Sequence, residues 1–173
     1  MAFLHKRIWK AQINDALVYW VYIPAGVILG GKLVDRVFRI PVFSEHFFFA
    51  VSGFVSLILG LLFIQRSMKD LALYGDGTPN PLAPPKRLVT EGSYRLCRHP
   101  MFFGYNMTAL GVALFLRSPG TLLLSYPVFI FFEISFLRKE ERKLERRFPQ
   151  AFQAYREGTP FLVPSVFGKR ANI

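Results

Sequence analysis

Three groups of residues in this sequence are of types that do chemistry, and each lies inside an apolar run or at its edge. The first is a pair of adjacent carboxylates, Glu140 and Glu141, which follows an apolar run. Carboxylates are natural partners for a cationic ligand. The second is the tripeptide Arg98-His99-Pro100, which directly precedes another apolar run. A helix that begins at Pro100 offers free backbone N–H groups to an anion.

The third group is Glu133, which lies inside the apolar run 120–137. A carboxylate within a membrane segment is costly and is a functional candidate by default. The alternative is a protonated carboxyl that is hydrogen-bonded to Asn106 or Thr108 on a neighbouring helix. Arg138 lies between Glu133 and Glu140, where a carboxylate or phosphate of a substrate could bind. Its alternative role is a basic anchor at the membrane edge.

The residues that flank the membrane also have ordinary structural interpretations. The carboxylate of Glu141 could pair with Arg138, and that of Glu145 with Arg142, as weak ion pairs on a solvated helix face. Arg98 could reach a lipid phosphate instead of a bound ligand. The spacing of these residues leaves both interpretations open.

The composition of the chain indicates an integral membrane protein. Its 173 residues are 52% hydrophobic, 16% aromatic and 19% charged, and the apolar residues cluster in long runs. A soluble domain carries about 25% charged residues. A single Cys excludes a disulfide scaffold, and no group of residues calls for a metal. The net charge of +11 is explained by membrane topology, so nucleic-acid binding is not expected.

The apolar runs predict an all-α bundle with about four transmembrane helices, at 16–31, 47–64, 101–116 and 120–137. The tight turn 117–120 predicts that the last two form an antiparallel hairpin. Gly26 and Gly30 form a G-x-x-x-G, which indicates helix packing. No G-x-G-x-x-G follows a strand, and little strand pattern is present, so a dinucleotide-type fold is not expected.

The distribution of Lys and Arg predicts that both termini are cytoplasmic. With four spans, 18 of the 22 basic residues fall on the side of the two termini and four on the other side. The apolar spacing over 3–13, with basic residues between, predicts a helix lying on the membrane surface. No signal-peptide cleavage site is expected.

Two segments between and after the spans are too structured to be plain connectors. The loop 66–99 is rich in Gly and Pro in its first part and then tightens toward His99. The tail continues the fourth span as a helix until Pro149 interrupts it. Phe152 and Tyr155 then predict a short second helix that ends near Gly158 and Pro160.

Two sequence blocks in these segments resemble the isoprenylcysteine carboxyl methyltransferase family, which is related to the membrane phospholipid N-methyltransferases. The first block is Leu88-Val89, Gly92, Tyr94-Arg95, Arg98-His99-Pro100-Met101 and Gly104; the second is Glu140-Glu141, Phe148, Tyr155 and Phe161-Leu162-Val163-Pro164. The stretch 77–81 resembles bacterial members of the family. The resemblance covers roughly residues 66–164.

The resemblance implies one membrane domain over 1–173 that binds S-adenosylmethionine in a cytosolic pocket formed by about 75–105 and 138–164. It implies that Glu140 contacts the cofactor and that Glu141 supports it. The implied cofactor-binding residues are Leu88, Val89, Tyr94, Arg98, His99, Pro100, Phe102, Glu140, Glu141 and Tyr155. Phe102 departs from the family pattern, which often has Tyr at this position.

The implied reaction is methyl transfer to a membrane-soluble small molecule or lipid, with Glu133 and Arg138 on the acceptor side. Carboxyl O-methylation of a prenylcysteine-like acid would use a cation such as Arg138. N-methylation of an amino lipid would use an acid such as Glu133. The alternative is a non-catalytic membrane protein that keeps the fold and binds a lipid or partner. A bacterial inner membrane is the expected location.

Overall fold

The computed structural model describes residues 21–77 and 84–165, and this part of the chain is helical, with no strand. The expected helix on the membrane surface, 3–13, lies outside the described residues. The long helices are α2 (Ile23–Phe38), α3 (His46–Gly75), α4 (Pro100–Leu116) and α5 (Tyr126–Arg147), followed by the short α6 (Pro149–Gly158). A 3-10 turn, η2, spans Gly92–Arg95, and a π-helical turn, η3 (Thr121–Ser125), leads directly into α5. The all-α prediction is therefore confirmed for the described residues.

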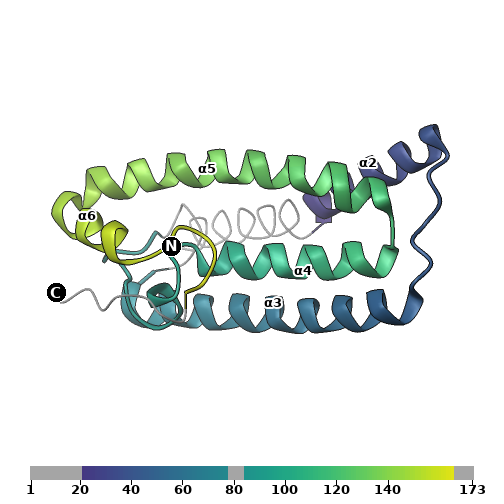
Figure 1. The fold of residues 1–173 in the computed structure, drawn as a ribbon. Helices are drawn as coiled ribbons and strands as arrows, with labels where there is room; N and C mark the ends of the chain where they lie inside the picture. Colours follow the sequence, from purple (N-terminus) through teal and green to yellow (C-terminus); the bar gives the residue numbers. More distant parts are fainter. Residues whose placement is uncertain (1–20, 78–83, 166–173) are drawn as a thin grey trace, which may run out of the picture.

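Helices α3, α4 and α5 lie side by side with alternating directions, with α4 between the other two (Figure 1). Helix α6 folds back at the end of the bundle where α3 ends and α4 begins. Helix α2 lies at the opposite end, against the start of the η3–α5 helix. We call the end that carries α6 the α6 end of the bundle. This arrangement brings the loop before α4 and the tail after α5 to the same end.

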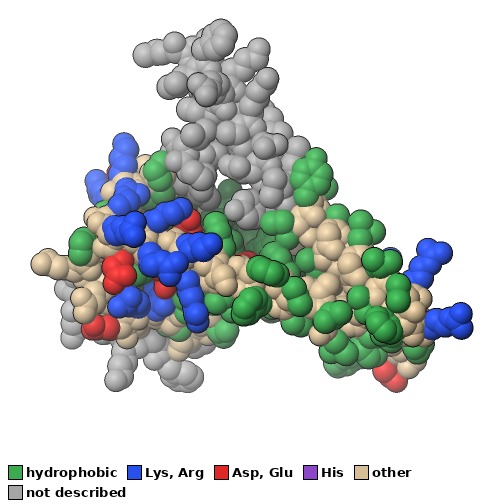
Figure 2. Space-filling view, turned by 90° about the horizontal axis from the view of Figure 1, so that it is seen from above, with side chains coloured by type: hydrophobic (Ala, Val, Ile, Leu, Met, Phe, Trp, Pro, Cys, Tyr) green, Lys and Arg blue, Asp and Glu red, His purple; other side chains and the backbone are tan. Residues whose placement is uncertain are grey.

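The outer surface of the bundle is apolar. Large side chains such as Phe47, Phe131 and Phe132 are 83%, 67% and 65% exposed. Figure 2 shows basic side chains gathered at the two ends of one face and hydrophobic ones between them. Two helical stretches, His46–Gly75 and Thr121–Arg147, are long and apolar enough to cross a membrane, and only 22% of the apolar window in each is buried inside the protein. The apolar helix Pro100–Leu116 is shorter. The chain is thus a helical membrane protein rather than a soluble bundle with an apolar core.

The helices correspond to the expected spans but are longer at two ends. The third expected span, 101–116, agrees with α4, and the fourth, 120–137, lies within the η3–α5 helix. Helix α3 does not end near 64 but continues to Gly75, because Ser67, Asp70 and Leu71 keep a buried face after the apolar run ends. Helix α2 likewise continues beyond Gly31 to Phe38. The part of the first span before residue 21 lies outside the described residues.

Four glycines set the register between α3 and α4. A Cβ atom on Gly53 would lie 2.9 Å from the carbonyl oxygen of Gly111, and one on Gly104 would lie 2.7 Å from that of Gly60. The pair Gly53–Gly111 and the pair Gly60–Gly104 are seven residues apart on each helix, so the same antiparallel contact repeats after two helical turns. We call these four glycines the α3–α4 glycine seam. Ser56 donates a hydrogen bond of 2.7 Å to the carbonyl of Met107 within it. Backbones this close gain dispersion contacts and do not require polar side chains.

The G-x-x-x-G at Gly26 and Gly30 was expected to mark helix packing, but α2 does not approach its neighbour most closely at these two residues. The described residues leave open space beside Gly26, and Gly30 has only an ordinary contact with Ser125. The close approach is at Gly31, whose carbonyl lies against Gly120. Asp35, one turn later, accepts hydrogen bonds from the backbone N–H of Gly120 at 2.7 Å and from the Ser118 hydroxyl. A half-buried carboxylate on α2 therefore holds the turn between α4 and α5.

We expect Gly60→Ala to destabilise the protein and Gly26→Ala to leave it unchanged or slightly more stable. The new methyl group at position 60 would meet the backbone of α4, and such overpacking costs about 1–3 kcal/mol. At position 26 alanine meets open space among the described residues and favours the helix by roughly 1 kcal/mol. Thermal unfolding of both variants in one detergent measures the difference. Equal unfolding temperatures would contradict the glycine seam.

Candidate functional site

An ion pair between Arg98 and Glu141 lies at the centre of the α6 end. The Arg98 Nε is 2.6 Å from Glu141 Oε1, and the two side chains are only 10% and 13% exposed. The same guanidinium donates to the carbonyl oxygens of Thr159 at 2.5 Å and Arg156 at 3.1 Å. Arg98 lies just before α4, Glu141 lies in the last third of α5, and Arg156 and Thr159 lie at the end of α6, so the pair joins all three elements.

His99 shares the same carboxylate. Its Nε2 lies 3.2 Å from Glu141 Oε1, and its ring meets Phe161 edge to face at 5.0 Å between centroids. The Arg98 guanidinium also lies over the Phe161 ring, 5.5 Å from its centroid. A carboxylate hydrogen-bonded to one ring nitrogen of a histidine fixes the orientation of the ring and leaves the other nitrogen for a different partner. Glu141 is therefore an orienting group for His99.

The ionised form of Glu141 is favoured in this setting. Burial alone would raise the pKa of its carboxyl, but the hydrogen bonds from His99 and Arg98 and their positive charges outweigh burial. The pKa of Glu141 is therefore held below its ordinary value. The group lies beyond the apolar stretch of α5, which ends at Leu137.

The tail closes over the loop that precedes α4 through three further hydrogen bonds. The Tyr155 hydroxyl donates to the carbonyl of Tyr94 at 2.6 Å. The Arg98 N–H donates to the carbonyl of Pro160 at 2.8 Å, and the Ser165 N–H to that of Leu96 at 2.9 Å. The segment before α4 and the tail after α5 are thus joined by one side-chain and two backbone hydrogen bonds between residues more than 60 positions apart.

Asp70 holds the loop from the other side, and sequence reasoning missed it. Its Oδ2 accepts a hydrogen bond of 2.7 Å from the Ser93 N–H, and it is buried at the end of α3. Gly92 has φ +60°, and any side chain there would meet the Asp70 carboxylate. The signal in the sequence was the position of Asp70 on the same side of the helix as Ser67 and Leu71, which remain buried after the apolar run ends.

The structure brings most of the implied cofactor residues to this end of the bundle. Val89 is buried against Gly75, Leu88 is half-buried beside it, and Pro100 is fully buried at the start of α4. The Phe102 ring lies one turn deeper, 6.1 Å from that of Phe136 on α5. The residues that form the joined cluster itself are Tyr94, Arg98, His99, Glu141 and Tyr155.

Glu140 and Arg138 lie outside that cluster. The Glu140 side chain is 36% exposed and pairs with Lys143 on its own helix at 2.6 Å. Arg138 is exposed and makes no hydrogen bond or ion pair with the rest of the described chain. The local pairs that the sequence offered as alternatives are wrong: Glu141 pairs with Arg98 rather than Arg138, and Glu145 pairs with Arg156 at 3.3 Å.

Glu133 lies in the buried face of α5, and its alternative partner Asn106 is confirmed. The Asn106 Nδ2 donates to Glu133 Oε2 at 2.5 Å, and the two residues are 7% and 6% exposed. Thr108, the other expected partner, donates instead to the carbonyl of Gly104. Glu133 precedes Glu141 by eight residues, which places it about 12 Å deeper along the helix.

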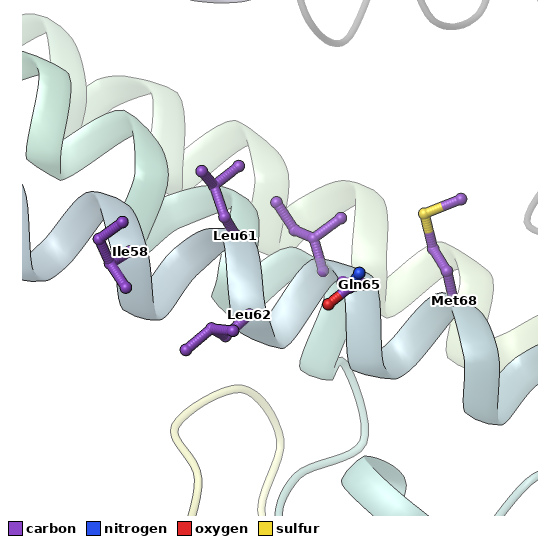
Figure 3. A pocket seen from close by; sticks show the side chains of 6 residues that line it. Ile58, Leu61, Leu62, Gln65 and Met68 are labelled. Atoms are coloured by element: carbon purple, nitrogen blue, oxygen red, sulfur yellow. The ribbon is translucent and has the colours of Figure 1, made fainter.

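A surface hollow elsewhere is not a candidate reaction site. It is lined by one face of α3, where Ile58, Leu61, Leu62, Gln65 and Met68 project side by side (Figure 3). No charged or nucleophilic group lines it.

The fold and the site define a helical membrane protein with a charged cluster at one end of its bundle. A sequence profile described as phospholipid methyltransferase matches residues 48–151, which is more than half of the chain. The chain therefore belongs to the phospholipid methyltransferase family, and it is a membrane methyltransferase. It is also 29% identical to the protein-S-isoprenylcysteine O-methyltransferase of Schizosaccharomyces pombe, over 91% of this chain and 72% of that protein. No solved structure matches the chain at a significant level.

We expect the stabilising effect of Glu141 to disappear in acid. Because its pKa is lowered in the folded state, its contribution is complete above the ordinary value of 4.5 and is lost as the pH falls below that value. Near neutral pH, Glu141→Gln should cost about 1.5–3 kcal/mol, the range for a hydrogen bond to a charged group. Thermal unfolding of both proteins from pH 7 to pH 3 measures the difference. A difference that stays constant or grows as the pH falls would contradict the pairing.

Proposed function

We propose that this protein transfers a methyl group from S-adenosylmethionine to an acceptor that is dissolved in the membrane. The observation that carries the proposal is the joined cluster of Arg98, His99, Glu141 and Tyr155, which closes the tail over the start of α4 in a member of a methyltransferase family. A site at the end of an apolar bundle is open to a polar cofactor from water and to an apolar acceptor from the bilayer.

The residues at the α6 end suit the charges of the cofactor. S-adenosylmethionine carries a cationic amino group and sulfonium and an anionic carboxylate, and when bound it supplies a methyl group activated by the sulfonium. Glu140 is the carboxylate suited to the amino group, because Lys143 is its only partner among the described residues, whereas Glu141 is already occupied. The second ring nitrogen of His99, which does not face Glu141, and the start of α4 suit the carboxylate end. The buried Ser93 hydroxyl oxygen has no partner among the described residues and fits a polar group of the ligand.

The remaining implied residues have supporting roles in this proposal. Leu88, Val89 and Tyr94 form a wall for the nucleoside part of the cofactor, with the Tyr155 hydroxyl fixing Tyr94 from behind. Phe102 separates His99 from the membrane interior; its ring is 6.4 Å from the imidazole. Methyl transfer requires alignment and exclusion of water more than a polar group at this position. Phenylalanine is therefore compatible with the reaction.

The acceptor is a lipid or a lipophilic small molecule. The Schizosaccharomyces pombe relative is named for methylation of isoprenylcysteine, and the family for phospholipids. Both kinds of acceptor place a polar head beside an apolar chain. We propose Glu133 and Arg138 as the residues on the acceptor side, Glu133 within the bundle and Arg138 at its exposed edge.

We further propose four membrane spans with both termini on the cytoplasmic side, in a bacterial inner membrane. Helix α4 and the first span would cross as shorter helices whose polar ends reach the interface. The excess of Lys and Arg on the side of the termini supports this orientation. A reporter that works only in the cytoplasm should be active when it is fused after Ile173. Activity of a periplasm-specific reporter at that position would overturn the topology.

We expect wild-type protein in detergent to bind S-adenosylmethionine and Glu140→Gln to bind it about 10- to 100-fold more weakly, which is roughly 1.5–3 kcal/mol for a lost charged hydrogen bond. Glu145→Gln is the matched control, because Glu145 lies on the same helix with similar exposure and pairs with Arg156. Calorimetric titration measures the binding. Transfer of a labelled methyl group into the organic-soluble fraction of a lipid extract then measures the reaction. Absence of binding at millimolar cofactor would sink the proposed function.

A further inference from the structure

A buried polar pair between α4 and α5 has two oxygen atoms without partners in the described part of the chain. The carboxylate of Glu133 and the amide of Asn106 share one hydrogen bond, but no described residue reaches Glu133 Oε1 or Asn106 Oδ1. Both residues are more than nine-tenths buried. A buried polar atom without a partner costs about 1–3 kcal/mol. We call these two residues the Asn106–Glu133 pair.

The network around Asn106 fixes which of its atoms is unpartnered. The side-chain NH₂ group donates both to Glu133 Oε2 at 2.5 Å and to the carbonyl of Phe102 at 3.0 Å. Both of these partners are acceptors, so the NH₂ must face them and the amide oxygen must face away. The Tyr126 hydroxyl does not reach this oxygen, because it donates to the backbone carbonyl of Asn106 instead.

The charges near the pair determine what kind of group could satisfy it. Asn106 Oδ1 can only accept a hydrogen bond, and so can Glu133 Oε1 in the ionised carboxylate, so a hydrogen-bond donor is the group that satisfies both atoms. No cation of the described chain pairs with Glu133. Arg138 follows five residues later, which turns it roughly 140° around the helix, and it is exposed. The environment of the pair therefore disfavours a carboxylate or phosphate ligand.

We propose that the Asn106–Glu133 pair binds the polar head of the methyl acceptor, and that this head is a hydrogen-bond donor, an amine or a hydroxyl. The inference rests on the proposed function in one respect, because it takes the bound molecule to be the acceptor. The ring pair of Phe102 and Phe136 lies between the Asn106–Glu133 pair and the α6 end, one helical turn from each of its members. The donor head is thus held on the membrane side of those rings.

The test uses three probes with the same twelve-carbon chain: dodecylamine, dodecanol and dodecanoic acid. Thermal unfolding of the purified protein is measured with each probe, with no cofactor and no turnover. We expect the amine or the alcohol to raise the unfolding temperature of the wild type, and the acid to raise it less. Glu133→Leu, which removes both acceptor oxygens of residue 133, should abolish the shift. Glu145→Gln on the same helix should retain it.

A second variant distinguishes the two sources of the donor. Glu133→Gln keeps an acceptor oxygen but removes the negative charge, so it should lose the response to an ammonium head and retain the response to a hydroxyl. Both Glu133 variants should bind S-adenosylmethionine within about threefold of the wild type, because residue 133 lies about 12 Å from Glu141 along the helix. With cofactor present, each variant that loses the probe response should also lose methyl transfer at least tenfold.

Two results would overturn the inference. One is a shift with dodecanoic acid as large as that with the amine and the alcohol and lost in Glu133→Leu, which would mean that the pair binds an acid. The other is an equal shift with all variants, which would mean that the probes act elsewhere. The proposed function fails separately, by absence of cofactor binding in the wild type, whatever the probes do.

Discussion

The α6 end of this protein depends on one nearly buried ion pair, Arg98 with Glu141. Burying both charges is costly, and the cost is met only when the remaining donors and acceptors also find partners. Arg98 meets this condition by donating to the carbonyls of Arg156 and Thr159 as well as to the carboxylate. A lysine has a single ammonium and could not span these three positions. The start of α4, the side of α5 and the end of α6 are therefore fixed relative to one another by one planar group.

Two other carboxylates of the described chain, the half-buried Asp35 and the buried Asp70, follow the same rule, and this makes the exception informative. Asp35 is satisfied by the turn between α4 and α5, and Asp70 by the Ser93 N–H and Arg66. Each of these anchors a loop to a helix. Glu133 is as buried as Asp70, but one of its oxygens has no partner among the described residues, and the same holds for one oxygen of its neighbour Asn106. The proposed acceptor site rests on this incomplete set of partners.

The features that the sequence could predict are those whose interacting residues lie close together along the chain. Apolar runs and turn residues predicted α4, the hairpin and the short α6, because those signals are local. The predicted span ended at Ile64 because the following residues are no longer mostly apolar. Helix α3 nevertheless continues to Gly75, since one of its faces remains buried. The contacts of Arg98 with Glu141, and of Asp70 with Ser93, join residues 43 and 23 positions apart, which spacing alone does not reveal. The resemblance placed both blocks in one pocket, but local pairing rules proposed the wrong partners for Glu141.

The two proposals together constrain where the transferred methyl group would have to travel. Reacting atoms in a displacement approach to about 3–3.5 Å, whereas Glu141 and Glu133 are separated by roughly 12 Å along α5. If both proposals hold, the cofactor would reach from the α6 end toward the membrane, and the acceptor head would approach it near the rings of Phe102 and Phe136. Apolar rings at that level would exclude water from the site without competing for the transferred group. By this argument position 102 requires an aromatic ring, which Phe102 supplies, and does not require the hydroxyl group of a tyrosine.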